Sequence, residues 1–155
     1  MEHGAEIESF DDAFDRLFRI AYRSAYRLLG SREDAEDVAI DALTRASLHW
    51  RKVRTDPAPW VTTVSANLAI DIWRRRKRTP IHPPSSETDP LDGRRIDLLR
   101  ALEHLPRRQR DTVVLRYFAD LTESQTAEAL GISTGTVKQH ASRAMVTLKR
   151  ELGEP

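Results

Sequence analysis

Residues 121–144 decide the fold, and their sequence is LTESQTAEALGISTGTVKQHASRA. The pattern predicts a short helix, a sharp turn and a second helix. Thr122, with Gln125 three residues later, forms a capping box that begins the first helix. Gly131 supplies the left-handed residue that ends this helix, and Ser133 is a favourable N-cap for the next one.

The second helix has an apolar side and a polar side. Its apolar residues recur at helical spacing: Val137, Ala141, Ala144 and Leu148. Side chains that can hydrogen-bond to base edges share the opposite side: Gln139, Ser142, Arg143 and Arg150. Such a helix suits the major groove of duplex DNA. The turn alone fits an ordinary helical hairpin equally well, so the rest of the chain must decide.

Charge is distributed unevenly along the chain. The 155 residues include 25 Lys and Arg and 24 Asp and Glu, and the net charge of +1 gives no sign of nucleic-acid binding. Residues 1–73 are acidic overall, whereas residues 74–78 are five consecutive basic residues. A helix C-terminus favours some cations, but five adjacent like charges repel one another. Contact with a phosphate backbone explains the basic run better.

Several classes of chemistry are excluded by composition and spacing. The chain has no cysteine, which removes disulfides, thiolate chemistry and cysteine-based zinc sites. The five histidines lack metal-ligand spacing, and the sequence has no phosphate-binding glycine loop and no nucleophile elbow. We therefore expect no enzyme activity, no metal and no cofactor. We also expect no signal peptide and no membrane span, which suits a cytoplasmic protein.

The N-terminal part predicts three helices, over residues 8–29, 31–49 and 60–78. Ser31 is a favourable N-cap for the second helix, and acidic residues crowd its first turn, where the helix dipole favours them. Ile40 lies on the acidic side of this helix. It is either an ordinary exposed apolar residue or part of a surface that binds a partner.

Residues 51–59 are predicted to be a loop because they contain two prolines. The loop has three basic residues, which could bind single-stranded nucleic acid or simply be solvated. In the following helix, Asn67 and Arg74 lie opposite the apolar stripe. Trp73 either stacks on a base or closes a core.

Residues 79–95 are rich in proline and serine and predict a linker. We therefore expect an all-α chain with two domains, over residues 1–78 and 96–155. The second domain is predicted to have four short helices, one of them continuous over residues 107–118.

Four ordered segments resemble the sigma-70 family, specifically the small extracytoplasmic-function (ECF) sigma factors of bacteria. The first is DAEDV at residues 34–38, followed by Arg45 and Ala46. The second is Trp60, then ANLAID at residues 66–71 and the basic run. The third is LEHLPRRQR at residues 102–110. The fourth is LGISTGTVK at residues 130–138, followed by Arg143 and Ala144.

The resemblance implies a specificity subunit with a region 2-like and a region 4-like domain. Its partners are bacterial core RNA polymerase (the β′ clamp helices and β) and promoter DNA, and an anti-sigma factor is a candidate partner. Implied polymerase contacts are Asp34, Glu36, Asp37, Ile40 and Asp41. Implied contacts to the −10 element are Lys52, Arg54, Asn67, Trp73, Arg74, Arg75 and Arg76. Implied contacts to the −35 element are Ser133, Thr134, Thr136, Lys138, Gln139, Ser142 and Arg143.

The chain departs from the family pattern at two places. The family more often has Gln at Ile40 and Ser-Arg at Gln139-His140. Because Arg pairs best with guanine and Gln with adenine, we predict that Arg143 contacts G and Gln139 contacts A, with Lys138 on phosphate. The alternative function is a stand-alone helix-turn-helix regulator. Such a regulator would need neither the acidic helix at residues 31–49 nor the basic loop at residues 51–59. A sigma factor is expected in the cytoplasm and at the nucleoid during initiation.

Overall fold

The computed structural model describes residues 6–78 and 92–153, and every regular element within these ranges is helical. The elements are α1 (Phe10–Leu29), α2 (Arg32–Leu48), α3 (Trp50–Val53), α4 (Pro57–Arg78), α5 (Asp92–His104), α6 (Arg107–Val113), the π-helical turn η1 (Val114–Phe118), α7 (Glu123–Leu130) and α8 (Thr134–Glu151). The predicted all-α fold is confirmed. None of the described helices is both long and apolar enough to cross a membrane.

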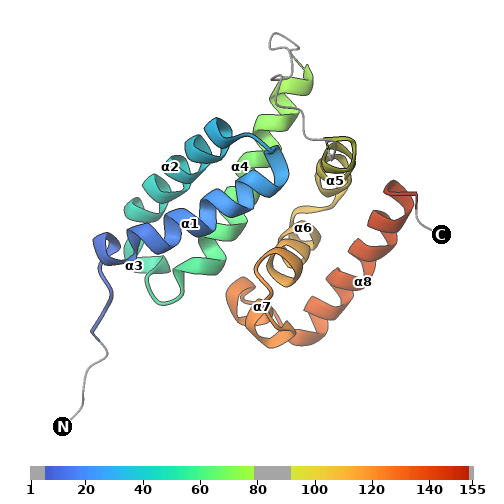
Figure 1. The fold of residues 1–155 in the computed structure, drawn as a ribbon. Helices are drawn as coiled ribbons and strands as arrows, with labels where there is room; N and C mark the ends of the chain where they lie inside the picture. Colours follow the sequence, from blue (N-terminus) through green and yellow to red (C-terminus); the bar gives the residue numbers. More distant parts are fainter. Residues whose placement is uncertain (1–5, 79–91, 154–155) are drawn as a thin grey trace.

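The described residues form two groups of helices, shown in Figure 1. The N-terminal half (residues 6–78) has α1, α2 and α4 lying side by side, and the C-terminal half (residues 92–153) contains α5 to α8. Residues 79–91 of the predicted linker lie outside the described residues. The linker was predicted to reach residue 95, but α5 already begins at Asp92.

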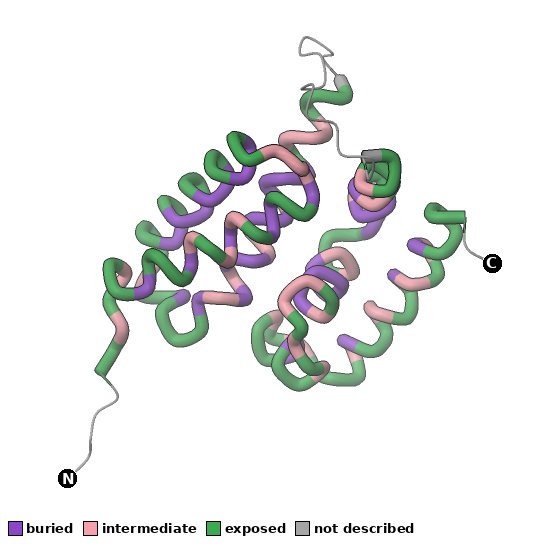
Figure 2. The backbone as a smooth tube through the Cα atoms, viewed as in Figure 1, coloured by how far each residue is buried: buried purple, intermediate pink, exposed green. Residues whose placement is uncertain are grey.

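The first core fills the space between α1, α2 and α4 and is built mainly from small side chains. Its buried members are Ala13, Leu17, Ala21, Ala25, Ala35, Val38, Ala39, Ala42, Leu43, Ala46, Val61 and Leu68. Alanines on the facing sides allow close packing, because the distance between helix axes depends on the side chains at the contact. In Figure 2 the buried positions of these helices face their neighbours, and the outer sides are exposed.

The N-terminal half follows the predicted helices with small shifts at their ends. The side chain of Ser31 accepts a hydrogen bond from the Asp34 amide at 3.3 Å, which confirms the predicted N-cap of α2. Helix α4 begins at Pro57 rather than at residue 60. Proline fits the first turn of a helix because the N–H it lacks would have no partner there.

Residues 51–53 of the predicted loop are helical instead, and together with Trp50 they make up α3. In this single turn, the amide of Arg54 donates to the Trp50 carbonyl at 2.8 Å. Val53 is buried, so an apolar contact fixes this turn. A run of four helical residues is too short to show the 3.6-residue period that predicts a helix from sequence.

The helix-turn-helix has the predicted caps. Thr122 and Gln125 form both bonds of the capping box, at 3.1 Å and 2.9 Å. Gly131 ends α7 with a φ of 66°, and the amide of Ile132 donates to the Ala127 carbonyl at 3.0 Å. The side chain of Ser133 then caps α8.

The helix predicted over residues 107–118 changes type before its end. Residues Val114–Phe118 form the wider π-helical turn, and the amide of Ala119 donates to the Val114 carbonyl at 3.2 Å. Three consecutive residues, Val113, Val114 and Leu115, are all buried. Helix α6 packs against α8 and η1 packs against α4, which accounts for burial on more than one side.

A second core joins the two halves. Its members from α1 and α4 are Leu28, Ala66, Ala69 and Ile70, and those from α5, α6, η1 and α8 are Leu99, Ala101, Leu102, Leu105, Val113, Val114, Ala144 and Leu148. The sequence did not predict this contact, since the side of α4 that carries Asn67 was expected to be exposed.

Candidate nucleic-acid interface

The polar side of α8 is exposed as predicted. Val137, Ala144 and Leu148 are buried against the rest of the C-terminal half. The exposed members of the set predicted for the −35 element are Ser133, Thr134, Lys138, Gln139, Ser142 and Arg143. Thr136 is partly buried, and its hydroxyl lies 2.8 Å from that of Ser133. Burial of the opposite side therefore fixes the direction in which these polar side chains point.

The N-terminus of α8 is held against α7 by the short turn. Lys138 lies 3.8 Å from Glu123, and this pair is largely exposed. An exposed pair of this kind contributes little to stability, so Lys138 can exchange Glu123 for a phosphate at low cost. Gln139 and Arg143 are exposed and lie one helical turn apart on this side.

The basic set predicted for the −10 element is spread along α4. Lys52 and Arg54 are exposed just before this helix, and Arg74, Arg75 and Arg76 lie near its C-terminus. The rise of about 1.5 Å per residue places the two groups roughly 25–30 Å apart. The structure therefore separates the two groups along α4 and does not bring them into one pocket.

Side chains at the C-terminus of α4 have different surroundings. The Arg75 Nε donates to the Asp71 carbonyl at 3.4 Å, and Arg75 is exposed. Trp73 is partly buried, and the Lys77 ammonium lies 4.5 Å from its ring centroid. The ring packs against the second core, which supports the core-closing interpretation of Trp73.

Arg76 holds a carboxylate of α2. Its two terminal nitrogens donate to Asp34 at 2.5 Å and 2.6 Å, a bidentate pair. The hydrogen bond with Asp34 raises the pKa of Arg76. Asp34 is buried, with 8% of its surface exposed, so its carboxylate is not part of the outer surface of α2.

The other acidic residues of α2 form an exposed strip. Glu36, Asp37, Ile40 and Asp41 are all exposed, and Ile40 is 58% exposed. Leu48 at the end of α2 is a second exposed apolar residue, with 76% of its surface accessible. It was not among the residues predicted to bind polymerase. Its position eight residues after Ile40, close to two helical turns, is the signal that indicates a shared side.

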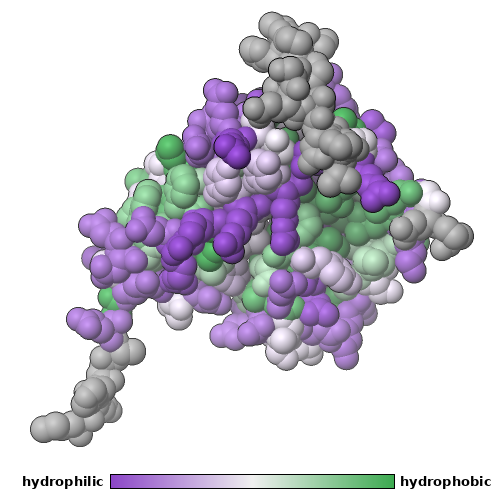
Figure 3. Space-filling model, in the orientation of Figure 1, coloured by the Kyte–Doolittle hydropathy of each residue, from purple (hydrophilic) through white to green (hydrophobic). Residues whose placement is uncertain are grey.

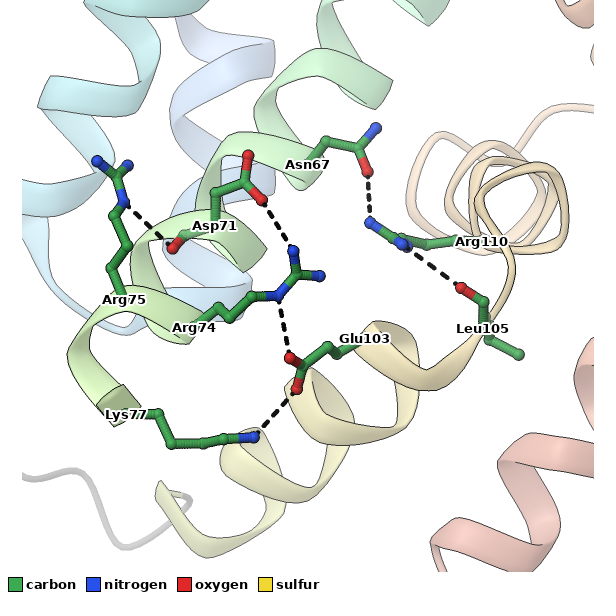
Figure 4. Close-up of polar contacts among 8 residues, drawn as sticks. All are labelled: Asn67, Asp71, Arg74, Arg75, Lys77, Glu103, Leu105 and Arg110. Carbon is green, nitrogen blue, oxygen red and sulfur yellow. Dashed lines mark hydrogen bonds and ion pairs between the residues drawn. The ribbon is translucent and has the colours of Figure 1, made fainter. Parts of the chain in front are cut away.

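Asn67 and Arg74 face the C-terminal half. The Asn67 amide accepts from Arg110 at 2.9 Å and donates to Asp111 at 3.2 Å. Arg74 donates to Glu103 at 3.0 Å. Figure 4 shows Asn67 and Arg74 pointing from α4 toward the C-terminal half. Burial lowers the pKa of Arg110, the partner of Asn67.

Comparison with known proteins identifies both halves. The model of Sigma-70 region 2 matches residues 13–79, and that of Sigma-70 region 4 matches residues 95–148. The ECF RNA polymerase sigma factor SigM of Mycobacterium tuberculosis is 36% identical, over 91% of this chain and 78% of that protein. This chain is an ECF RNA polymerase sigma factor. RNA polymerase sigma-E factor of Streptomyces coelicolor is 33% identical, over 95% of the chain and 88% of that protein.

Two solved structures have the same fold. The sigma factor RpoE, solved in complex with the anti-sigma factor NepR from Bartonella quintana, is 24% identical with a TM-score of 0.54, over 93% of this chain and 96% of that chain. CnrH, solved in complex with the cytosolic domain of CnrY, is 19% identical with a TM-score of 0.60, over 93% and 87%. At these identities the likeness describes the fold.

Within residues 6–78 and 92–153, no three His, Cys, Asp or Glu side chains gather where a metal ion could bind.

The surface of α1 also carries exposed arginines, namely Arg16, Arg19, Arg23 and Arg27. Figure 3 shows the hydrophilic band over α1 and apolar side chains gathered on the C-terminal half.

Proposed function

We propose that this sigma factor binds core RNA polymerase and directs promoter-specific initiation of transcription, with a separate surface for each contact. The observation that carries the proposal is that one chain has an exposed acidic strip on α2 and an exposed Gln/Arg side on α8. Its relatives are named RNA polymerase sigma factors, which supports these partners. The sigma factor then works in the cytoplasm, at the nucleoid during initiation, and an anti-sigma partner stays a prediction.

The polymerase contact is proposed on the exposed side of α2, at Glu36, Asp37, Ile40 and Asp41. Ile40 would fill an apolar site, and the carboxylates around it would face basic residues of the partner. Complementary charges of this kind speed encounter and fix the register of docking. Asp34 is left out of this contact, because Arg76 already occupies its carboxylate.

The −10 contact is proposed along α4. Lys52 and Arg54 at one end and Arg75 at the other are exposed cations that suit the phosphates of an extended strand. Asn67 and Arg74 lie between these ends and would contact base edges. Proteins that bind single strands typically use basic side chains along the path of the phosphate backbone.

The −35 contact is proposed for α8 in the major groove. Arg143 would pair with guanine and Gln139 with adenine, since each presents two hydrogen-bonding atoms to that base. Lys138, with Ser133 and Thr134 at the N-terminus of α8, would contact phosphates. Contacts to phosphate position the helix and carry no sequence information.

The test is run-off transcription with purified bacterial core polymerase and a promoter library. We expect transcripts only when the sigma factor is added, from start sites that share two upstream elements. Tight binding of duplex DNA by the sigma factor alone, with no transcript, would contradict the proposal.

Substitutions in α8 make the same assay specific for the −35 contact. Gln139→Ala should reduce discrimination at one adenine by roughly 5- to 150-fold, as a bidentate contact is worth about 1–3 kcal/mol. Lys138→Ala is the matched control, because a lost phosphate contact weakens all promoters about equally. An unchanged base preference in Gln139→Ala would refute the assignment.

A further inference from the structure

A pocket of about 400 Å³ lies between α1, the beginning of α4 and the segment that joins η1 to α7. Pockets that bind small molecules typically enclose about 300–1,000 Å³ and often lie between domains. They combine a largely apolar lining with a few polar groups that orient the ligand. The residues that line this pocket are outside the sets proposed above for polymerase and for DNA, so its role has to be found separately.

One side of α1 forms the basic wall of the pocket. Arg23 and Arg27 line it one helical turn apart, and Ser24 lies between them in the sequence. Both arginines are exposed, and neither pairs with a carboxylate anywhere in residues 6–78 and 92–153. A guanidinium group binds phosphate well, because its planar donors match two phosphate oxygens at once. This wall therefore suits a phosphate group.

The hydroxyl of Ser24 has an unusual environment. Ser24 is only 6% exposed, yet within the described parts of the chain its hydroxyl has no hydrogen-bond partner. Buried hydroxyls in a helix can donate to the carbonyl four residues earlier, as Thr62 and Ser65 of α4 do at 2.8 Å and 2.7 Å. Ser24 lines the pocket without such a bond, so its hydroxyl is available to a ligand.

The opposite wall is the turn that follows η1. Phe118 and Leu121 give this wall an apolar surface next to Asp120. Asp120 has a φ of 53°, the one positive value outside glycine among the residues that the structure describes. The amide of Leu121 donates to the Leu115 carbonyl at 3.0 Å and fixes the turn. An unfavourable backbone conformation held in place by its surroundings is common at ligand sites.

Two carboxylates also line the pocket, Asp56 from the N-terminal half and Asp120 from the C-terminal half. Both are exposed, and in the part of the chain described here neither forms an ion pair. An ionised carboxylate only accepts hydrogen bonds, so it suits a hydroxyl or amino group of a ligand and not its phosphate. The pocket therefore offers cations for an anion, acceptors for donor groups and an apolar surface.

We propose that this pocket binds a nucleoside monophosphate, with the phosphate on Arg23, Ser24 and Arg27. Two guanidinium groups match the charge of about −1.5 to −2 that one phosphate ester carries at pH 7. The base packs against the apolar wall at Phe118, and Asp120 accepts from hydroxyl or amino groups of the nucleoside. Inorganic phosphate would leave the apolar wall and the carboxylates unused. This binding site is independent of the proposed function, because it needs neither polymerase nor DNA.

Isothermal titration calorimetry of the full chain with each common ribonucleoside 5′-monophosphate tests the proposal. We expect at least one of them to bind with a Kd of roughly 10 µM to 1 mM, as is typical of a small ligand in a site that is partly open. The matching nucleoside and inorganic phosphate should each bind at least roughly tenfold more weakly, because each lacks part of the contacts. Absence of binding by all of the monophosphates, or equal binding of inorganic phosphate, would overturn the proposal.

Substitutions on α1 test the basic wall. Arg23→Gln should weaken binding at least roughly tenfold, since it removes a charge-assisted contact to phosphate. Ser24→Ala should weaken binding without lowering Tm, because the hydroxyl has no partner to lose in the free protein. Arg19→Gln is the matched control, since Arg19 is exposed on the same helix and does not line this pocket. Equal losses in Arg19→Gln and Arg23→Gln, or no loss in Arg23→Gln and Ser24→Ala, would overturn the proposal.

NMR chemical-shift changes in the isotope-labelled sigma factor locate the bound nucleotide. The amides of Ser24, Asp120 and Leu121 should shift on addition of the monophosphate that binds in the calorimeter, and those of Gln139 and Arg143 should not. The expected shifts lie in both halves because both halves line the pocket. Shifts confined to α8 or to the basic end of α4 would mean that the nucleotide takes the place of a DNA phosphate there, and would overturn the proposal.

Discussion

Asp34 and Arg76 join the beginning of α2 to the end of α4. Forty-two residues separate them in the chain, and the pair is bidentate with one partner buried. The resemblance placed Asp34 among polymerase contacts and Arg76 among DNA contacts. Their geometry gives both residues a structural role, since each occupies the hydrogen-bonding groups of the other.

Removing the charge of Asp34 should destabilise the sigma factor. Asp34→Asn leaves Arg76 without its carboxylate, and we expect a loss of about 1–3 kcal/mol in the free energy of unfolding. The half-exposed Arg76 side chain, at 50%, keeps the loss below that of a fully buried pair. Urea denaturation monitored by circular dichroism measures the difference.

Asp41→Asn is the control for this loss. Asp41 pairs with Arg45 at 2.9 Å on the same helix, and both side chains are about half exposed. An exposed pair of this spacing contributes about 0.3–0.5 kcal/mol. Equal stability changes in the two variants would contradict a structural role for the Asp34–Arg76 pair.

At the scale of elements, the turn between α7 and α8 depends on Gly131. Its φ of 66° is unfavourable for a residue with a Cβ atom, although a Cβ here would meet no atom within 4 Å. Gly131→Ala should therefore cost about 1–2 kcal/mol from backbone conformation alone. Differential scanning calorimetry should show a lower Tm.

Gly135→Ala tests the same substitution within a helix. Gly135 lies in the first turn of α8, where a Cβ would make an ordinary contact of 3.8 Å with Ser133. Alanine favours helix over glycine, so stability should rise by up to about 1 kcal/mol. A fall in Tm for both variants would show that φ at Gly131 does not determine the effect.

Local signals predicted most of the helices but only one side of α4. Caps such as Ser31 and Thr122 act within a few residues of the helix they begin, so the sequence contains them directly. Ala66, Ala69 and Ile70 give α4 a second apolar side, and a helix that is apolar on several sides is buried on several sides. This pattern was present in the sequence and was interpreted as a single stripe.

At the scale of the whole molecule, the contact between the halves could not be predicted from local pattern. Glu103 and Lys77 are 26 residues apart, with the predicted linker between them. A Pro- and Ser-rich linker indicates that two units exist and says nothing of how they pack. The polar side chains of α8 were predicted correctly as exposed, because their position depends only on helical period.

The sigma factor is expected to hold a promoter at two points, with α4 on the −10 strand and α8 on the −35 duplex. Two linked weak sites gain affinity only when the spacing lets both bind at once. Polymerase would supply that spacing by holding the two halves apart. Neither half is then expected to select a promoter by itself.

A promoter spacer series with core polymerase tests this account most directly. On a promoter selected from the library, five extra base pairs between the two elements rotate the −35 element by about half a helical turn. We predict that the run-off transcript falls at least tenfold, and that deletion of the −35 element has a similar effect. Transcript yield that is independent of the spacer and of the −35 element would contradict the two-point contact.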